Sequence, residues 1–190
     1  VPLLFENMLS GIIKKYRAIK GGGVVFAASK ILALPLGNEA RRKLFSSVHR
    51  FFGGKLRRLI CGAAALNPET FKTFELLGFE VHVGYGLTET SPVCILHGDF
   101  YRSPDDIGML LPGLSAEIVD PDKNGVGELV IKGDNVMLGY YENPAETEKV
   151  MRDGWFYTGD LAQQKENGAF RIVGRCKNMI VVENGKKVFP

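Results

Sequence analysis

One short segment combines residue types that could bind a nucleotide. It follows a run typical of a buried strand, Phe79–Val83, and reads Gly84-Tyr85-Gly86-Leu87-Thr88-Glu89-Thr90. Glycines on both sides of an aromatic residue let the backbone turn sharply and approach a planar ligand. Thr88 offers a hydroxyl to a phosphate oxygen, and Glu89 offers a hard oxygen ligand suited to Mg²⁺. Standing alone, the segment also fits a glycine-rich surface turn.

Four further motifs follow in order: Gly127–Gly133, Met137–Tyr141, Gly154–Leu161 and Gly174–Lys177. Together with the first segment they resemble the adenylate-forming enzymes, which include acyl-CoA synthetases, firefly luciferase and the adenylation domains of peptide synthetases. The resemblance extends through nearly the whole chain from about Leu56. The amino-acid sequences of three of the motifs look most like those of the long-chain fatty acyl-CoA synthetases.

The resemblance implies a site for ATP and Mg²⁺. Thr88 would hydrogen-bond the α-phosphate and Glu89 would hold Mg²⁺ on the phosphates, so these are the expected catalytic residues. Asp160 would accept both ribose hydroxyls, since a carboxylate has two oxygens matched to a vicinal diol. Arg175 would fork onto ribose or phosphate oxygens. The alternatives are a surface pair for Thr88 and Glu89, an Asx turn after Gly159, and a surface salt bridge for Arg175.

Further residues are implied around the adenine and the acyl chain. Tyr85 would stack on adenine, with Gly84 and Gly86 permitting the approach, and the alternative is a buried core tyrosine. Ile172 would pack on the adenine. Small residues would line the nucleotide and acyl pocket, namely Gly62, Ala63 and Ala64.

In this family a carboxylate attacks the α-phosphorus of MgATP, pyrophosphate leaves, and a thiol such as that of CoA captures the acyl-adenylate as a thioester. Positioning and charge stabilisation dominate such a reaction. The resemblance therefore implies a long-chain fatty acid–CoA ligase that uses ATP, Mg²⁺, CoA and a fatty acid. A ligase for a shorter or aromatic acid is the alternative, and a non-catalytic nucleotide- or lipid-binding module is the alternative for the isolated 190 residues.

The chain departs from the family pattern in what it contains. The phosphate loop rich in Ser, Thr and Gly is absent, and so is the small C-terminal domain that carries the lysine needed for adenylation. We therefore expect an internal fragment that is inactive by itself, and the opening on Val1 rather than methionine agrees. Asn178 stands where many relatives have Asp or Lys at the hinge between domains, which leaves the charge of that hinge open.

The elements that must position these residues indicate an α/β fold. In residues 1–107, strands at Leu56–Ile60 and Phe79–Val83 flank a helix capped by Asn67, which predicts a parallel sheet with ligand sites beyond the carboxyl ends of its strands. In residues 108–190, short alternating runs with Asn-Gly pairs predict a β-rich subdomain that ends at the hinge. The expected chain is thus part of a large AMP-binding domain, with a boundary near Gly108.

Helices are predicted elsewhere from apolar periodicity and capping signals. An amphipathic helix is expected over Leu3–Ile19, with the glycines at 21–23 as a linker. A second helix is expected from an N-cap at Asn38 to Phe52, and a third over Pro144–Met151.

Composition excludes several classes of protein. With 45% hydrophobic and 24% charged residues, the chain is neither disordered nor collagen-like. The longest nearly apolar stretch, Val24–Leu36, is interrupted by Lys30 and is shorter than the roughly 20 residues that span a bilayer. Three cysteines without a CxxC pair indicate reduced thiols rather than a disulfide framework or a zinc site. We expect a cytoplasmic protein.

Charge is concentrated at the start of the chain. The first 60 residues hold 12 Lys and Arg against Glu6 and Glu39. One hypothesis is that a basic cluster faces CoA phosphates or an anionic membrane surface, to which the enzyme would bind peripherally. Its members are Arg41, Arg42, Lys43, Arg50, Lys55, Arg57 and Arg58. Solvated helix faces are the alternative, and the absence of a nucleic-acid motif argues against a nucleic-acid partner.

Overall fold

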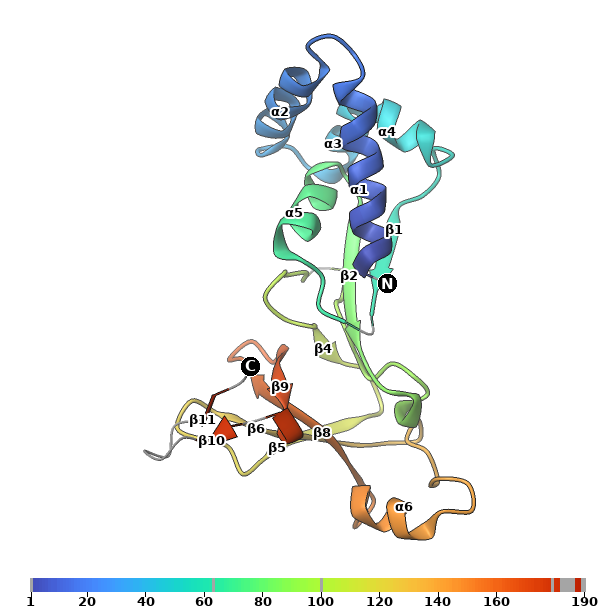
Figure 1. Cartoon of the computed structure of the whole chain (residues 1–190), viewed down its shortest axis with the longest axis vertical. Coiled ribbons are helices and arrows are strands. Elements are labelled where there is room, and N and C mark those ends of the chain that lie inside the picture. The colour runs from blue at the N-terminus through green and yellow to red at the C-terminus, as the bar shows by residue number, and fades with distance from the viewer. Residues whose placement is uncertain (1, 63, 100, 179, 182–186, 189–190) are drawn as a thin grey trace. The chain divides into compact units, whose positions relative to one another are not determined.

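The computed structural model describes residues 2–62, 64–99, 101–178, 180–181 and 187–188. The chain forms two compact units, Val1–Val83 and Gly84–Pro190 (Figure 1). The division lies after Val83 rather than near Gly108. The reason is that residues 84–107 belong to the pairing of the second unit, where Gly84 and Tyr85 pair with Leu96 and Ile95.

The first unit begins with helices α1 (Pro2–Arg17) and α2 (Gly22–Ala33). The expected helix at the start of the chain is confirmed, but the glycine triplet is not a linker, because α2 begins inside it. Gly21 adopts a left-handed conformation with φ 75° and turns the chain between the two helices. Gly22 is buried, and a Cβ there would lie 2.1 Å from the Tyr16 carbonyl oxygen, so the tight turn requires glycine.

The single helix expected from Asn38 to Phe52 is instead two helices, α3 (Asn38–Leu44) and α4 (Ser46–Phe51). Phe45 interrupts them with φ −99° and ψ 32°, and its side chain is buried in contact with the Phe26 ring. The N-cap position belongs to Gly37, and Asn38 is the first helical residue. Long-range burial of one aromatic side chain therefore interrupted the local helical pattern.

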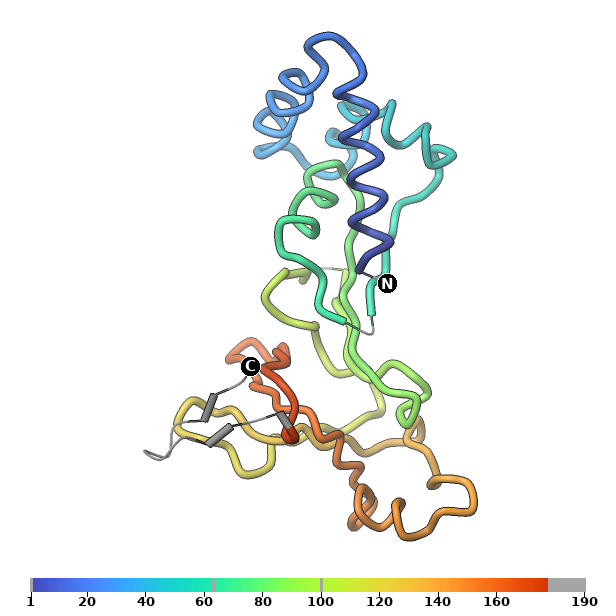
Figure 2. The backbone as a smooth tube through the Cα atoms, viewed as in Figure 1, coloured from blue at the N-terminus to red at the C-terminus, as the bar shows by residue number. Residues whose placement is uncertain are grey.

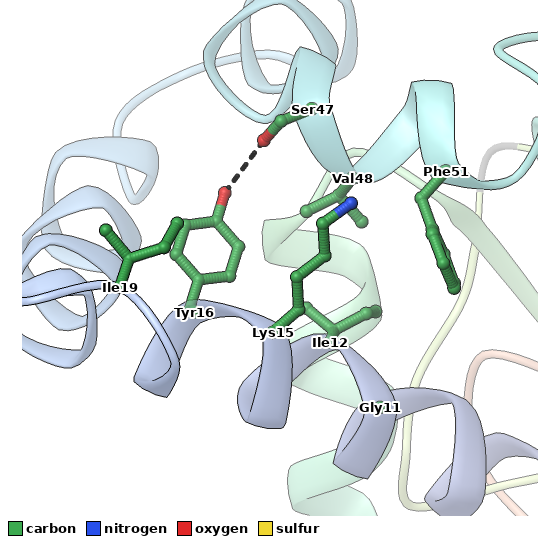
Figure 3. A pocket seen from close by; sticks show the side chains of 8 residues that line it. All are labelled: Gly11, Ile12, Lys15, Tyr16, Ile19, Ser47, Val48 and Phe51. Atoms are coloured by element: carbon green, nitrogen blue, oxygen red, sulfur yellow. Dashed lines mark hydrogen bonds between the residues drawn. The ribbon is translucent and has the colours of Figure 1, made fainter.

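A groove lies between α1 and α4 (Figure 3). The Tyr16 hydroxyl and Ser47 Oγ form a hydrogen bond of 3.1 Å at one end, and the Lys15 ammonium lies 4.9 Å from the centre of the Phe51 ring at the other. Its remaining lining is largely apolar and includes Ile12 and Val48.

A strand–helix–strand unit completes the first unit: β1 (Arg58–Cys61), α5 (Pro68–Leu76) and β2 (Glu80–Tyr85). β1 and β2 are parallel, with Cys61 opposite Val83, which confirms the predicted parallel pair. The Asn67 side chain accepts hydrogen bonds from the backbone N–H groups of Glu69 and Thr70, so the predicted cap is also confirmed. Gly78 ends the unit's helix with φ 86°, as expected of a C-terminal glycine.

The second unit is built from antiparallel strands, which confirms the β-rich prediction. The strands are β3 (Ile95–Leu96), β4 (Met109–Leu110), β5 (Ser115–Val119), β6 (Val126–Lys132), β7 (Met151–Arg152), β8 (Trp155–Gln164) and β9 (Phe170–Arg175). The main sheet has the order β5-β6-β8-β7, with β9 also paired to β8. Figure 2 traces the backbone of this unit from green to red. Its core holds Leu129, Ile131 and Phe170.

Short elements fill the remainder of this unit. They are the 3₁₀ turns η1 (Thr88–Thr90) and η2 (Cys176–Asn178), helix α6 (Pro144–Val150), and the antiparallel pair β10 (Ile180–Val181) and β11 (Lys187–Val188). The Asn143 side chain accepts a hydrogen bond from the Glu146 N–H, which confirms the cap predicted for α6. The Asn-Gly pair at 184–185 lies outside the described residues. Among the helices that the structure describes, none is long and apolar enough to cross a membrane.

Four arginines of the expected basic cluster bond to groups of the fold itself. Arg41 donates to the carbonyls of Ala33 and Leu34 at the end of α2 and to that of Glu75 in α5. Arg42 donates to the carbonyls of Leu56 and Gly54, and salt bridges join Arg57 to Glu39 and Arg58 to Glu80. Because helix ends leave carbonyl groups without partners, the Arg41 guanidinium holds the end of α2 in place. These four side chains thus have partners within the fold, whereas Lys43, Arg50 and Lys55 of the same cluster are exposed.

Candidate functional site

The carboxylate of Asp160, on β8, is the centre of the candidate site. Its Oδ2 accepts a 2.6 Å hydrogen bond from the Tyr85 hydroxyl at the end of β2, and its Oδ1 accepts a 2.7 Å bond from Nε of Arg175 at the end of β9. Asp160 and Arg175 are paired residues of the β8–β9 ladder. Three predicted site residues are therefore brought together, although 75 positions separate Tyr85 from Asp160.

Tyr85 and Arg175 hold this carboxylate from different environments. Tyr85 packs against the core that contains Cys94 and Ile95. Burial, followed by the hydrogen bond to Asp160, raises the pKa of the Tyr85 phenol far above its usual range, so the phenol remains a donor. The Arg175 side chain is 57% exposed, and its bond to Asp160 raises the pKa of its guanidinium. Arg175 is thus the charged partner with access to solvent.

The backbone before Asp160 is held by Thr158 and Glu128, for which no role was predicted from the sequence. Thr158 Oγ1 donates to the Leu129 carbonyl and accepts from the Asp160 N–H at 3.1 Å. Glu128 Oε1 accepts from the Gly159 N–H, at a point where the pairing of β6 with β8 shifts register. Gly159 has φ 70°, a conformation that favours glycine. This bulge sets the direction in which Asp160 leaves the strand.

The turn that carries Thr88 and Glu89 is braced by a buried threonine and an asparagine. Thr90 Oγ1 accepts a 2.9 Å bond from the Leu87 N–H, and Asn135 Nδ2 donates to the Thr90 carbonyl at 2.8 Å. The Thr90 side chain is fully buried. Neither residue was predicted from the sequence, and only the Thr-x-Thr spacing within the first motif could have indicated Thr90.

Glu89 is held by the segment that follows β6. Its backbone carbonyl accepts from the Met137 N–H, and its Oε1 accepts a 2.8 Å bond from the Tyr140 hydroxyl. This bond raises the pKa of the Tyr140 phenol. A carboxylate has about four acceptor positions, so one hydrogen bond leaves capacity for a cation. Thr88, beside it, is exposed.

The glycines of the first motif are required by the protein's own backbone. A Cβ on Gly86 would lie 1.7 Å from the Pro92 carbonyl oxygen, and one on Gly84 would lie 2.9 Å from Leu96 Cδ1. The sequence explanation, that these glycines admit a planar ligand, is therefore incomplete. Their lack of a Cβ also allows the backbone at Pro92 and the Leu96 side chain to pack closely against them.

No hydrogen bond joins the remaining predicted residues to the Asp160 or Glu89 side chain within the part of the chain that the structure describes. Ile172, on β9, packs against the same core as Tyr85. Gly62 follows β1 in the first unit and is half-buried, and Ala63 lies outside the described residues. Tyr85 and Glu89 are four residues apart, so their Cα atoms are at most about 14 Å apart by chain length alone. The roles assigned to all of these residues remain predictions.

The carboxylate oxygens of Asp160 and Glu89 fit a nucleotide with a divalent cation. Asp160 uses one acceptor position on each oxygen for Tyr85 and Arg175, which leaves one on each for a vicinal diol. Mg²⁺ characteristically binds one or two carboxylates together with substrate phosphates. Glu89 could supply one such carboxylate. Within the described ranges, no cluster of three or more His, Cys, Asp or Glu side chains could hold a metal ion by itself.

A family model described as "AMP-binding enzyme" matches residues 2–141. Asp160, Ile172 and Arg175 lie beyond that match. The chain is 36% identical over 195 residues to a long-chain-fatty-acid–CoA ligase of Salmonella typhimurium, covering 96% of this chain and 32% of the relative. It is 38% identical over 160 residues to long chain acyl-CoA synthetase 1 of Arabidopsis thaliana, covering 76% and 23%. The chain thus spans about a third or less of the length of these relatives.

Solved structures with the same fold agree with that match. ATP-bound MatB from Rhodopseudomonas palustris superimposes with a TM-score of 0.66 and 31% identity, over 78% of this chain and 32% of that one. The anthranilate CoA ligase AuaEII, solved with anthranoyl-AMP, has a TM-score of 0.64 and 22% identity, over 70% of this chain and 27% of that one. At that identity the second likeness concerns the fold alone.

Proposed function

The chain belongs to the AMP-binding enzyme family, and we propose that it is the nucleotide-binding part of a long-chain fatty acid–CoA ligase. The reaction has two steps. An oxygen of the fatty acid carboxylate bonds to the α-phosphorus of ATP as the bond to pyrophosphate breaks. The sulfur of CoA then bonds to the acyl carbon, AMP leaves, and the thiol proton is released.

The single observation that carries the proposal is the buried Asp160 carboxylate held between Tyr85 and Arg175. Two fixed oxygens, each with acceptor capacity left, match the two hydroxyls of a ribose. Arg175 is largely exposed, so it can exchange one bond to Asp160 for a ribose or phosphate oxygen. Tyr85 is held in the core and keeps the carboxylate in position while that exchange occurs.

The phosphate end of the nucleotide belongs to η1. Thr88 donates its exposed hydroxyl to the α-phosphate, and the Glu89 carboxylate, oriented by Tyr140, holds Mg²⁺. The bound cation would neutralise charge on the phosphates. Tyr85 is held by the core and by its bond to Asp160, and this restriction favours the alternative of a core tyrosine over stacking on adenine.

Substrate class and location rest on the relatives' names and on chemistry. The names of the Salmonella and Arabidopsis relatives favour a long-chain acid and CoA. A ligase for a shorter or aromatic acid is the competing function, and the isolated chain could act only as a binding module. An enzyme that consumes ATP and CoA belongs where both are supplied, so the cytoplasmic location stays part of the proposal.

The test is acid-dependent exchange of pyrophosphate into ATP, measured with palmitate, octanoate and benzoate. It is run on the full-length product of the gene and on the 190-residue chain. We expect exchange by the former with palmitate, and none by the chain alone. The matched variants are Asp160→Asn and Asp120→Asn; Asp120 is exposed, and its φ of 49° is one that asparagine tolerates.

The outcomes separate the alternatives. Exchange that is lost in Asp160→Asn and kept in Asp120→Asn supports the assigned site. Preference for benzoate or octanoate overturns the long-chain assignment while keeping the adenylation, and full-length protein without exchange for any acid overturns the function. Exchange by the 190-residue chain would contradict the expectation that this piece is inactive.

A further inference from the structure

Helix α2 presents aliphatic side chains to solvent. Val24 is 76% exposed, Ile31 67% and Leu32 63%, whereas Phe26 and Ala33 are 6% and 0% exposed. Successive residues of an α-helix lie about 100° apart, so the exposed residues cover the side opposite Phe26 and Ala33. Ala28 is also exposed and lies among them. The outward face of α2 is thus apolar throughout.

This is the reverse of an ordinary surface helix, which directs its apolar stripe inward and its charges to water. The polar residues of α2, Ser29 and Lys30, lie at the flanks of the helix, between its buried and outward faces, and both are only half exposed. Leu34, which follows the helix, is 62% exposed. An exposed run of this kind marks a surface that contacts something other than water.

The stretch of sequence that contains α2 carries charge of one sign. From Asn7 to Asn38 the sequence contains no Asp or Glu, and it contains five basic residues: Lys14, Lys15, Arg17, Lys20 and Lys30. Three of these close the last turn of α1, and Lys20 lies in the turn that leads into α2. Arg17 and Lys20 are exposed. An apolar helix face bordered by basic residues is complementary to anionic headgroups above an acyl layer.

We propose that the outward face of α2, with the basic turn that precedes it, is a docking surface for a membrane that contains anionic lipids. The surface is defined by Arg17, Lys20, Val24, Ile31 and Leu32. It differs from the basic cluster suggested by the sequence, of which Arg41, Arg42, Arg57 and Arg58 are bonded within the fold. Neither apolar burial nor charge alone gives stable anchoring, and this surface offers both.

Two other occupants could cover the same face. One is a second copy of the chain, and the other is a further segment of a longer protein, since the relatives are about three times as long. Protein segments that cover an aliphatic helix do not require a basic border, and the single sign of charge therefore favours the lipid surface. Both alternatives are outcomes of the test.

The experiment measures binding of the 190-residue chain and of the full-length gene product to sedimented vesicles. The vesicles are phosphatidylcholine alone or phosphatidylcholine with phosphatidylglycerol, at low and at high salt. We expect binding to the anionic vesicles that weakens as salt is raised, because the interaction with basic side chains decays within a Debye length.

Two pairs of matched variants locate the surface. Val24→Gln with Ile31→Gln removes the apolar face, and its control is Leu3→Gln with Leu4→Gln, where both leucines are also exposed in a helix. Arg17→Gln with Lys20→Gln removes charge, and its control is Lys43→Gln with Lys55→Gln, from the cluster that the sequence suggested. Each α2-side variant should weaken anionic-vesicle binding at least about tenfold, and each control less than about twofold.

Circular dichroism and thermal midpoints establish that each variant is folded. If Val24→Gln with Ile31→Gln unfolds the chain, Val24→Ala with Ile31→Ala is used in its place, because alanine has a high helix propensity. Binding only by the short chain, equal loss in the controls, or equal binding to neutral vesicles overturns the proposal. So does a dimer in gel filtration that the α2 variant dissociates. None of these results depends on whether the protein adenylates a fatty acid.

Discussion

Replacing Asp106 by asparagine tests a buried polar network of the second unit. The Asp106 side chain is fully buried. Its Oδ2 accepts hydrogen bonds from the Tyr101 hydroxyl at 2.6 Å and from Lys165 Nζ at 2.8 Å. Its Oδ1 lies 3.1 Å from His97 Nε2 and accepts from the Gly108 N–H at 3.2 Å. The network joins the segment before β4 to the turn between β8 and β9.

The direction of the pKa of Asp106 shows that the charged form is stabilised. Burial by itself raises this pKa, but the hydrogen bonds from Lys165 and Tyr101, together with the charge of Lys165, hold it below its ordinary value. Asparagine keeps the shape and loses the charge. It also turns one of two acceptor oxygens into a donor that faces other donors.

The magnitude follows from the burial of both partners. Breaking a buried ion pair from one side costs about 3–5 kcal/mol, and partial exposure of the remaining charge reduces that cost. The Lys165 side chain is 31% exposed. We therefore expect Asp106→Asn to lower the free energy of unfolding by about 2–4 kcal/mol at pH 7, a large share of the roughly 5–15 kcal/mol typical of a domain.

The assay is urea denaturation of the chain between pH 7 and pH 3, with Asp105→Asn at an exposed neighbour as the control. A lowered folded pKa stabilises the fold above the unfolded value of about 3.9, and this contribution is lost as pH falls through the folded value. The gap between wild type and Asp106→Asn should therefore narrow in acid. Equal midpoints for the two variants at pH 7, or a gap that does not narrow, would refute the reasoning.

Three further predictions concern the site and the first unit. Asp160→Ala in the full-length protein should weaken ATP binding, measured by calorimetry, because two hydrogen bonds to an ionised acceptor are worth about 1.5–3 kcal/mol each; unchanged affinity would leave Asp160 a structural residue. Gly86→Ala should lower the free energy of unfolding by about 1–3 kcal/mol or more through collision with the Pro92 carbonyl, whereas Gly98→Ala, which meets nothing within 4 Å, should change little. Arg41→Ala should cost about 1–3 kcal/mol in thermal unfolding because three carbonyls lose a donor, in contrast to Lys43→Ala at an exposed position.

The sequence by itself determined the elements whose signals are local. Asn67 before Pro68 and Gly78 after the apolar residues predicted α5 with its cap and its end, and the Asn-Gly pair at 167–168 predicted the β8–β9 hairpin. The order of the motifs likewise predicted the family that the comparisons show. Such signals act within a few residues, through hydrogen bonds to neighbouring N–H groups or through the conformations that glycine permits, so no tertiary contact is needed to read them.

Only the tertiary structure decided which distant residues meet. Thr90 is held by Asn135, and Asp160 by Tyr85, across 45 and 75 positions. The expected single helix is divided in two at Phe45, whose side chain is buried. Arg41, expected in an anion-binding cluster, instead donates to carbonyls at the end of α2. Each of these results depends on the packing of elements far apart in the chain. A residue's neighbours in sequence do not determine that packing. The amino-acid sequence could therefore suggest the roles of these residues but not their contacts.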